Sequence, residues 1–161
     1  MARLWIFFLL SMALATSAAA QGGSLGIFGT WGAFRDGGRC YAIAEPEKPD
    51  RSGARPFASV SWWPAKGARG QLHFRLAQPK RAGSAVLLRV DDRTFQLRGG
   101  GADAWATDAG ADSEIVSAMR TGIAMSIQTR SASGAVLHDT YALRGAATAI
   151  DAAAIACARR P

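Results

Sequence analysis

The stretch IFGTWGAFRDGGRCYAIA, residues 27–44, decides the fold class of this chain. Side chains alternate in character along IFGTWGAFR (Ile27–Arg35) and again along RCYAIA (Arg39–Ala44), as they do in strands that bury one face. The tripeptide DGG between them is typical of a tight hairpin turn. The stretch therefore predicts two antiparallel strands, Ile27–Arg35 and Arg39–Ala44, joined by this turn.

The rest of the chain carries similar short segments separated by turns. Glycine and proline mark a flexible lead-in at Gln21–Gly26, a loop at Glu45–Pro56 and a strand break at Gly99–Gly101. Apolar residues at helical spacing predict helices over Asp108–Arg120 and Ala146–Ala158. The other expected strands are Phe57–Trp63, Gln71–Gln78, Ala85–Val90, Thr94–Arg98, Ala102–Ala106, Ile123–Arg130 and Ala135–Leu143.

This pattern predicts a mainly β fold: an antiparallel β-sandwich or barrel-like domain of about nine short strands with two short helices, one of them at the C-terminus. A length of 161 residues without internal repeats fits a leader followed by one domain over residues 21–161. Leu, Ile, Val and Phe number only 25 in residues 21–161, so we expect a thin core.

Residues 1–20 have the composition of a secretory signal peptide. Arg3 supplies a positive start, LWIFFLLSMALA (Leu4–Ala15) an apolar run of 12 residues, and AAA (18–20) a small-residue cleavage site before Gln21. Such a run is too short to cross the hydrocarbon core of a bilayer. We therefore expect export, cleavage near Ala20 and a mature chain in the periplasm or cell envelope.

The expected export bears on the redox state of the cysteines. Cys40 and Cys157 are the only two cysteines, and oxidising compartments favour disulfides. On the expected C-terminal helix, Cys157 follows Ile150 and Ala154 on one face, which places it toward the sheet and within possible reach of Cys40. One intramolecular Cys40–Cys157 disulfide is the economical pairing; two free thiols or an intermolecular pair is the alternative.

Positive charge is concentrated in one segment. The formal net charge is +7, and residues 66–98 contain eight basic residues against two aspartates. If Arg75 and Arg89 point outward from adjacent strands, they form a basic stripe with Arg93 and Arg98 near it. This stripe would attract a lipid headgroup, lipopolysaccharide, a cell-wall polymer or an acidic protein; the alternative is a solvated face that promotes solubility. Nucleic acid is not expected, because the chain is exported and lacks a base-stacking motif.

Trp62 and Trp63 form a second candidate binding feature. Adjacent side chains in a strand point to opposite faces, so one ring can fill the core while the other reaches a surface, edge or groove. An exposed ring beside basic residues suits carbohydrate, lipid or protein contact. We favour the interpretation that a second layer covers this ring, because a thin core needs its aromatic residues.

Catalysis and metal binding find little support in the sequence. His138 and Asp139, near Ser131, Ser133 and Thr140, have the residue types of a hydrolase, but the G-x-S-x-G motif is absent and adjacent strand residues point apart. The spacings typical of metal ligands are also absent. We expect no enzyme, cofactor or metal site, with a hydrolase using His138 as the alternative.

Taken in order, several segments resemble the invasion-associated locus B family of exported bacterial proteins. The resemblance covers nearly the whole mature chain and implies a β-rich periplasmic or envelope domain of Gram-negative bacteria. The family is named for a role in host-cell invasion, but it has no catalytic residues to transfer. The matching pieces are WGAF (31–34), RCYAIAEP (39–46), SVSWWP (59–64), FQL (95–97), AW (104–105), YAL (141–143) with Gly145, and AIDA (149–152) before Cys157.

The expected function is therefore non-catalytic. An envelope protein would bind an anionic component or a protein partner through the basic face 66–98 and Trp62 or Trp63, with peripheral membrane association as one form of this binding. A structural accessory subunit whose exposed tryptophan marks an interface is a further alternative.

Overall fold

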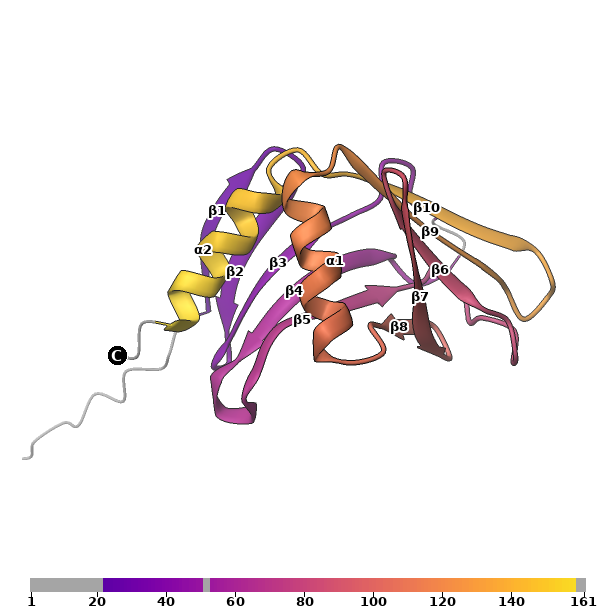
Figure 1. The fold of residues 1–161 in the computed structure, drawn as a ribbon, viewed down its shortest axis with the longest axis horizontal. Helices are drawn as coiled ribbons and strands as arrows, with labels where there is room; N and C mark the ends of the chain where they lie inside the picture. The colour runs from indigo at the N-terminus through magenta and orange to yellow at the C-terminus, as the bar shows by residue number, and fades with distance from the viewer. Residues whose placement is uncertain (1–21, 51–52, 159–161) are drawn as a thin grey trace, which may run out of the picture.

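The computed structural model describes residues 22–50 and 53–158, so the predicted leader 1–20 lies outside the described residues. Across the described part of the chain, ten strands form one antiparallel sheet, joined by two α-helices and a short 3-10 turn (Figure 1). The prediction of a mainly antiparallel β fold with two helices, one at the C-terminus, is confirmed. Neither helix has the length and apolar content that a membrane span requires.

The strands follow the order β1-β2-β3-β4-β5-β8-β7-β6-β9-β10 across the sheet. Their pairing is antiparallel throughout. The bounds are β1 Gly23–Phe28, β2 Trp31–Asp36, β3 Arg39–Ala44, β4 Phe57–Trp63, β5 Ala68–Arg75, β6 Val86–Val90, β7 Arg93–Gly100, β8 Asp103–Trp105, β9 Ala124–Arg130 and β10 Val136–Ala142.

The predicted first strand, Ile27–Arg35, is wrong as a single element. Gly29, with φ +61°, and Thr30 form a turn that divides it into β1 and β2. Strand β1 therefore takes up Gly23–Gly26, a segment whose glycines predict a flexible lead-in. This division accounts for the tenth strand.

The predicted strand break at Gly99–Gly101 is also wrong in part. Gly99 and Gly100 complete β7 and pair with Ala104 and Asp103 of β8, and the turn begins only at Gly101. A Cβ at Gly99 would overlap the side chains of neighbouring residues, so this position is glycine because a close approach requires it. The other elements match their predicted segments to within a few residues.

The two helices lie where the sequence places them. Helix α1, Ala109–Thr121, begins after Asp108, whose Oδ1 accepts a hydrogen bond from the backbone N–H of Ala111 at 2.9 Å. That N-cap bond is the largest cause that lowers the pKa of Asp108. Helix α2 spans Ala146–Ala158, the predicted range.

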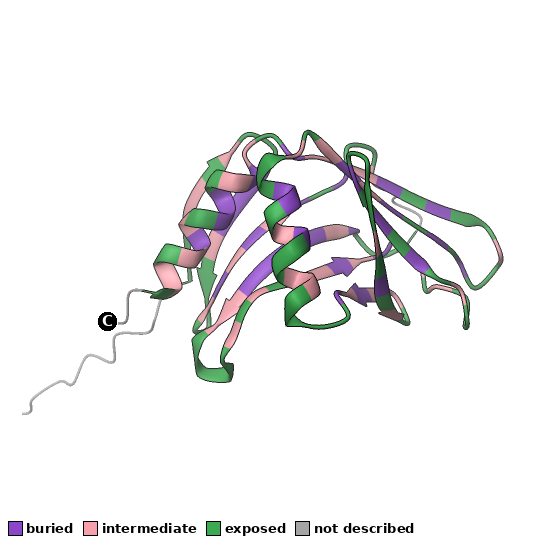
Figure 2. Cartoon of the chain, viewed as in Figure 1, coloured by how far each residue is buried: buried purple, intermediate pink, exposed green. Residues whose placement is uncertain are grey.

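The sheet curves around the helices, which cover its inner face (Figure 1). Helix α2 packs on β1 to β4, and α1 packs on β5, β6 and α2. Buried residues alternate with exposed ones along the strands, as Figure 2 shows, and the buried side chains such as Leu72, Phe74 and Leu88 meet the helices in one core.

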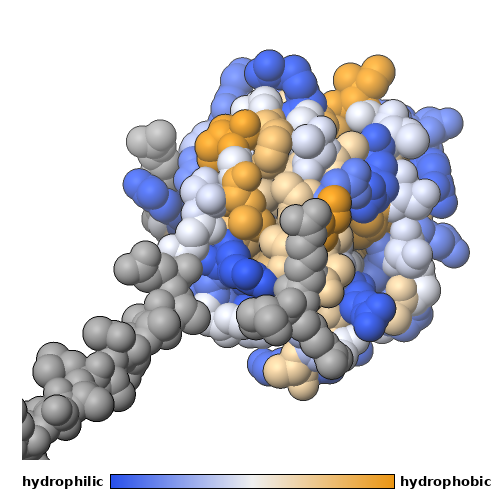
Figure 3. Space-filling view, turned by 90° about the vertical axis from the view of Figure 1, so that its left-hand side faces the viewer, coloured by the Kyte–Doolittle hydropathy of each residue, from blue (hydrophilic) through white to orange (hydrophobic). Residues whose placement is uncertain are grey.

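The C-terminal helix is fastened to the sheet at its far end. Cys40 on β3 and Cys157 on α2 form the predicted disulfide, with their Cα atoms 5.7 Å apart. Beside it, Arg35 donates a hydrogen bond of 2.7 Å to the carbonyl of Ala156, which places a cation at the C-terminus of the helix dipole. Figure 3 views this end of the molecule, where hydrophobic surface lies along α2 and hydrophilic surface surrounds it.

Candidate functional site

Trp62 and Trp63 occupy opposite faces of β4, as their adjacency predicts. Trp62 is half-buried against the inner core, beside a hollow of about 330 Å³ between α1 and the β4–β5 hairpin that Arg69 and Val116 also line. Trp63 is half-buried on the outer face, away from both helices, where it contacts the cations of Arg39 and Lys66. The cover over Trp63 thus consists of charged side chains instead of a second layer of helices or strands.

The outer face of β4 forms the floor of a hollow. Ser59 and Ser61 are small residues placed between Phe57 and Trp63, and alternation puts all four on the same face. Larger side chains on both neighbouring strands rise above these serines, which are buried although no other layer covers them. The cross-strand neighbours are Tyr41 and Ile43 on β3 and Gln71 and His73 on β5.

This hollow measures about 430 Å³, within the ~300–1,000 Å³ range of small-molecule sites. Its lining combines aromatic rings with a few hydroxyl, amide and cationic groups. We call it the outer hollow, and its lining residues are Arg39, Tyr41, Ile43, Phe57, Ser59, Ser61, Trp63, Gln71, His73 and Trp105.

One wall of the outer hollow is a cluster of aromatic and charged side chains around His73. Its ring stacks on Trp105 with centroids 5.4 Å apart and meets the edge of Phe57 at 5.2 Å. His73 Nε2 lies 2.8 Å from Asp103 Oδ1, and Arg75 Nε approaches the same oxygen at 3.2 Å. These contacts fix the imidazole and compensate the Asp103 carboxylate locally.

The opposite end of the outer hollow is cationic. The Arg39 guanidinium lies 4.2 Å from the ring centroid of Tyr41 and 5.0 Å from that of Trp63, and Lys66 Nζ lies 4.5 Å from the Trp63 centroid. Arg98 is the cross-strand partner of Trp105, so it reaches the same face at the other rim. Among the described residues, no carboxylate lies within ion-pair distance of Arg39, Lys66 or Arg98.

The predicted basic stripe is not continuous. Arg75 and Arg89 both point outward, but β8 and β7 separate their strands, so the two are not on adjacent strands. Arg75 is paired with Asp103, and Arg89 Nε donates to the carbonyl of Asp91 at 2.6 Å.

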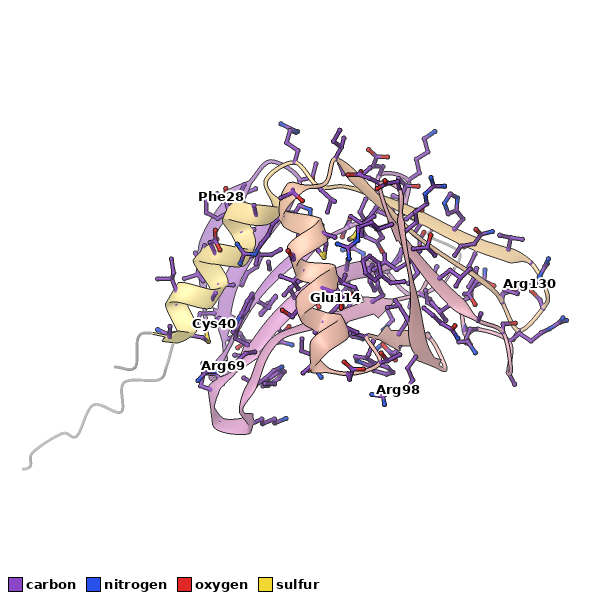
Figure 4. The ribbon with its side chains drawn as sticks, in the orientation of Figure 1. Phe28, Cys40, Arg69, Arg98, Glu114 and Arg130 are labelled. Atoms are coloured by element: carbon purple, nitrogen blue, oxygen red, sulfur yellow. A yellow bond between two sulfur atoms is a disulfide. The ribbon has the colours of Figure 1, made fainter. Side chains whose placement is uncertain are left out.

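The other two predicted arginines lie on opposite faces of β7. Arg93 lies on the inner side, 3.9 Å from Glu114 of α1, whereas Arg98 lies on the outer side. Figure 4 places Arg69 and Arg98 along one side of the molecule and Arg130 at its far end. Of the four predicted arginines, Arg98 is therefore the one beside the outer hollow without a carboxylate partner among the described residues.

Sequence reasoning did not find Arg39 or the outer hollow. The signal present was the i, i+2 spacing of Arg39 and Tyr41, which puts both on one face of β3. The pairing with Trp63 depends on the register of β3 with β4, which local periodicity does not encode.

The His138 region does not assemble as a triad. His138 is exposed on β10, while Asp139 is buried on the other face, where burial and the charge of Asp50 raise its pKa. Ser131 and Ser133 hydrogen-bond to each other at 2.8 Å.

In the outer hollow, the Ser59 hydroxyl is placed 3.5 Å from the backbone carbonyl of His73 and makes no hydrogen bond to its ring. No metal-binding cluster of three His, Cys, Asp or Glu side chains occurs in residues 22–50 and 53–158.

The protein is thus a curved antiparallel sheet with two helices on its inner face, one disulfide that joins α2 to β3, and an aromatic, cationic hollow on its outer face. The crystal structure of invasion associated protein B from Bartonella henselae has a similar fold, with a TM-score of 0.58 and 15% sequence identity. The match covers 83% of this chain and 98% of that one, and it shows a structural relationship. No protein family model matches the sequence, and no characterised protein is significantly similar to it in sequence.

Proposed function

We propose that this chain is an exported, non-catalytic envelope protein of the invasion-associated locus B type, and that it binds an anionic envelope component through its outer face. Three observations support this proposal: the leader-like residues 1–20, the ordered sequence resemblance, and the fold shared with invasion associated protein B. The site of binding follows from the arrangement of charge.

The observation that carries the proposal is the set of cations around the outer hollow. Arg39 and Lys66 lie on Trp63 at one end, and Arg98 lies beside Trp105 at the other rim, where it also lines a neighbouring hollow with Asp108 and Asp112; none of the three has a carboxylate within ion-pair distance among the described residues. Cations held on aromatic rings keep their charge while losing conformational freedom, so less entropy is lost when an anion binds. The same positive charge opposes the packing of two copies through this face, which favours a ligand of opposite charge.

The direct test measures binding of the mature, oxidised protein, residues 21–161, to vesicles that contain phosphatidylglycerol and to purified lipopolysaccharide. The triple variant Arg39→Gln/Lys66→Gln/Arg98→Gln should weaken binding about tenfold or more, since each lost charge-assisted contact contributes roughly 1 kcal/mol or more. Added salt should weaken wild-type binding in the same direction.

The matched control removes the same charge elsewhere. Lys48→Gln/Arg130→Gln/Arg144→Gln replaces three exposed cations that lie outside the outer hollow. If the control weakens binding as much as the triple variant, the protein acts only through its net charge and the proposed site is wrong. Equal binding by wild type and triple variant at low salt also contradicts it.

Export and the absence of catalysis have tests of their own. The protein recovered from the periplasm of a Gram-negative host should begin at or near Gln21, and a retained leader would contradict the proposed processing. If a hydrolase screen found an activity that His138→Ala abolishes, the non-catalytic assignment would fall.

A further inference from the structure

The outer hollow also indicates the chemical class of the ligand. We infer that it binds an acidic glycan, with one or two sugar residues over the Ser59–Ser61 floor and a carboxylate of the chain on Arg39 and Lys66. This inference rests on the proposed function, because it names the anionic component that the outer face binds. It follows from the floor, the walls and the cationic end of the hollow taken together.

The floor offers hydrogen-bonding groups in a row across three strands. Tyr41, Ser61 and Gln71 are successive cross-strand partners and lie on one face. Hydroxyl and amide groups both donate and accept hydrogen bonds, as sugar hydroxyls do. Ser59 and His73 form the adjacent row, so polar groups continue along the floor. An acyl chain would leave these groups without partners, which disfavours a lipid tail as the occupant.

The walls present aromatic side chains, of which Trp63 carries Arg39 and Lys66 on its ring and Trp105 is stacked on His73. Phe57 and Trp63 close the two ends of the β4 floor, and Trp105 closes the side beyond His73. The apolar C–H groups of a sugar ring can pack against such aromatic side chains, while its hydroxyl groups reach the floor. A shallow site with both kinds of surface suits a ligand that is amphipathic within each residue.

The cationic end of the outer hollow binds the carboxylate of the glycan. Arg39 contacts the rings of both Tyr41 and Trp63, so its guanidinium plane is restrained while its N–H donors have no carboxylate partner among the described residues. A restrained planar fork of donors matches the geometry of a carboxylate. Lys66, on the same Trp63 ring, adds a second charge without a fixed geometry.

The experiment titrates the mature, oxidised protein with trigalacturonic acid and follows tryptophan fluorescence and calorimetric heat. Maltotriose serves as the neutral sugar, and inorganic phosphate and phosphatidylglycerol vesicles serve as anions without a sugar ring. We expect trigalacturonic acid to bind at least about tenfold more tightly than maltotriose or phosphate. Arg39→Gln should remove most of this preference for the acidic sugar.

The floor has its own variants. Ser61→Val fills the floor without changing charge, and Ser126→Val makes the same change on the outer face of β9 as the control. Gln71→Leu is a second floor variant at an exposed position, which keeps the test valid if Ser61→Val folds poorly. Both floor variants should weaken the binding of trigalacturonic acid about tenfold, whereas Ser126→Val should leave that binding almost unchanged.

The outcomes separate the two proposals. If vesicles bind through Arg39, Lys66 and Arg98 but trigalacturonic acid does not bind, the glycan inference is overturned and the proposed function stands. If floor variants leave trigalacturonic acid binding unchanged, the sugar does not occupy the outer hollow and the inference is again overturned. If no anionic probe binds, both proposals fall.

Discussion

The indole N–H of Trp31 donates a hydrogen bond of 2.9 Å to the carbonyl of Ala142, across 111 residues of sequence. This bond joins the first residue of β2 to the last residue of β10, the second and the last strand in the sheet order, so residues near opposite edges of the sheet meet there. The backbone N–H of Thr30 adds a bond of 3.1 Å to the carbonyl of Arg144. Hydrogen bonds from Trp31 and Thr30 thus connect the start of β2 with the end of β10 and the segment that follows it.

Trp31→Phe should destabilise the protein by about 1–3 kcal/mol, because Trp31 is fully buried and the change removes both packing volume and this hydrogen bond. Urea unfolding followed by circular dichroism measures the loss. Trp63→Phe, on the solvent-facing side of β4, is the comparison and should cost less. Equal losses at the two sites would contradict the expectation that the buried Trp31 ring and its bond to Ala142 stabilise the fold more than the half-exposed Trp63 ring does.

Gly145→Ala should cost more than about 2 kcal/mol. Gly145 has φ +90°, a backbone conformation that side chains rarely adopt, and a Cβ there would overlap the carbonyl oxygen of Phe28. Strain and overlap each cost roughly 1–3 kcal/mol. Thermal unfolding checks the effect, with Gly83→Ala as the control, since Gly83 also has a positive φ (+76°) but open space around it. Similar losses in both variants would mean that backbone strain alone accounts for the cost.

Loss of the disulfide should destabilise the chain by about 3–5 kcal/mol. Cys40 and Cys157 are 117 residues apart, and the chain-entropy model gives roughly 4–5 kcal/mol for a loop of that length. The Cys40→Ser/Cys157→Ser variant should unfold at lower urea concentration and show faster hydrogen exchange at the end of α2. A reducing agent should bring the wild type to the level of this variant and leave the variant itself unaffected. Wild-type stability that reduction does not change would contradict the prediction.

Asp139→Asn should stabilise the protein at pH 7. Burial, together with the charge of Asp50, raises the pKa of Asp139 above the ordinary value of 3.8, so the folded state holds its proton more tightly than the unfolded state. The contribution of this group to the free energy of unfolding is therefore fully present below pH 3.8, and it is lost as the pH rises through the pKa of the folded state. As the pH is raised from below 3.8 to 7, the melting temperature of Asp139→Asn should fall less than that of the wild type.

The control for this pH dependence is Asp92→Asn, at an exposed position in the turn after β6. Because this side chain is exposed, the change should leave the melting temperature at pH 7 close to that of the wild type. If Asp139→Asn instead lowers the melting temperature at pH 7, the charged carboxylate makes a favourable interaction and the predicted direction of the effect is wrong.

Local signals in the sequence were sufficient for most of the fold. Alternation defined β3, the range of β4 was predicted correctly, helical spacing of apolar residues located α1 to within one residue, and the range of α2 was predicted correctly. The errors fell on glycines: Gly29 makes a turn, whereas Gly99 continues a strand. The same residue type serves both purposes, and only the neighbouring backbone decides between them.

The candidate site was less predictable. The sequence pointed to Trp63 and Arg98 as candidate binding residues. Their position beside the outer hollow depends on strand order, which local sequence patterns do not encode. Strand β8 pairs between β5 and β7, which brings Trp105 onto His73 and moves Arg89 away from Arg75. An expected stripe on adjacent strands therefore became separate groups, most of them with local partners.

The sequence by itself determined most of the strand segments and their apolar faces, where α1 and α2 form, and which two cysteines are available to pair. These properties follow from periodicity and residue type within a few neighbouring residues. The tertiary structure decided strand order and register, and through them the outer hollow and its cations. Register is a long-range property, because it depends on which side chains pack together across the whole sheet, and alternation along one strand is compatible with many partners.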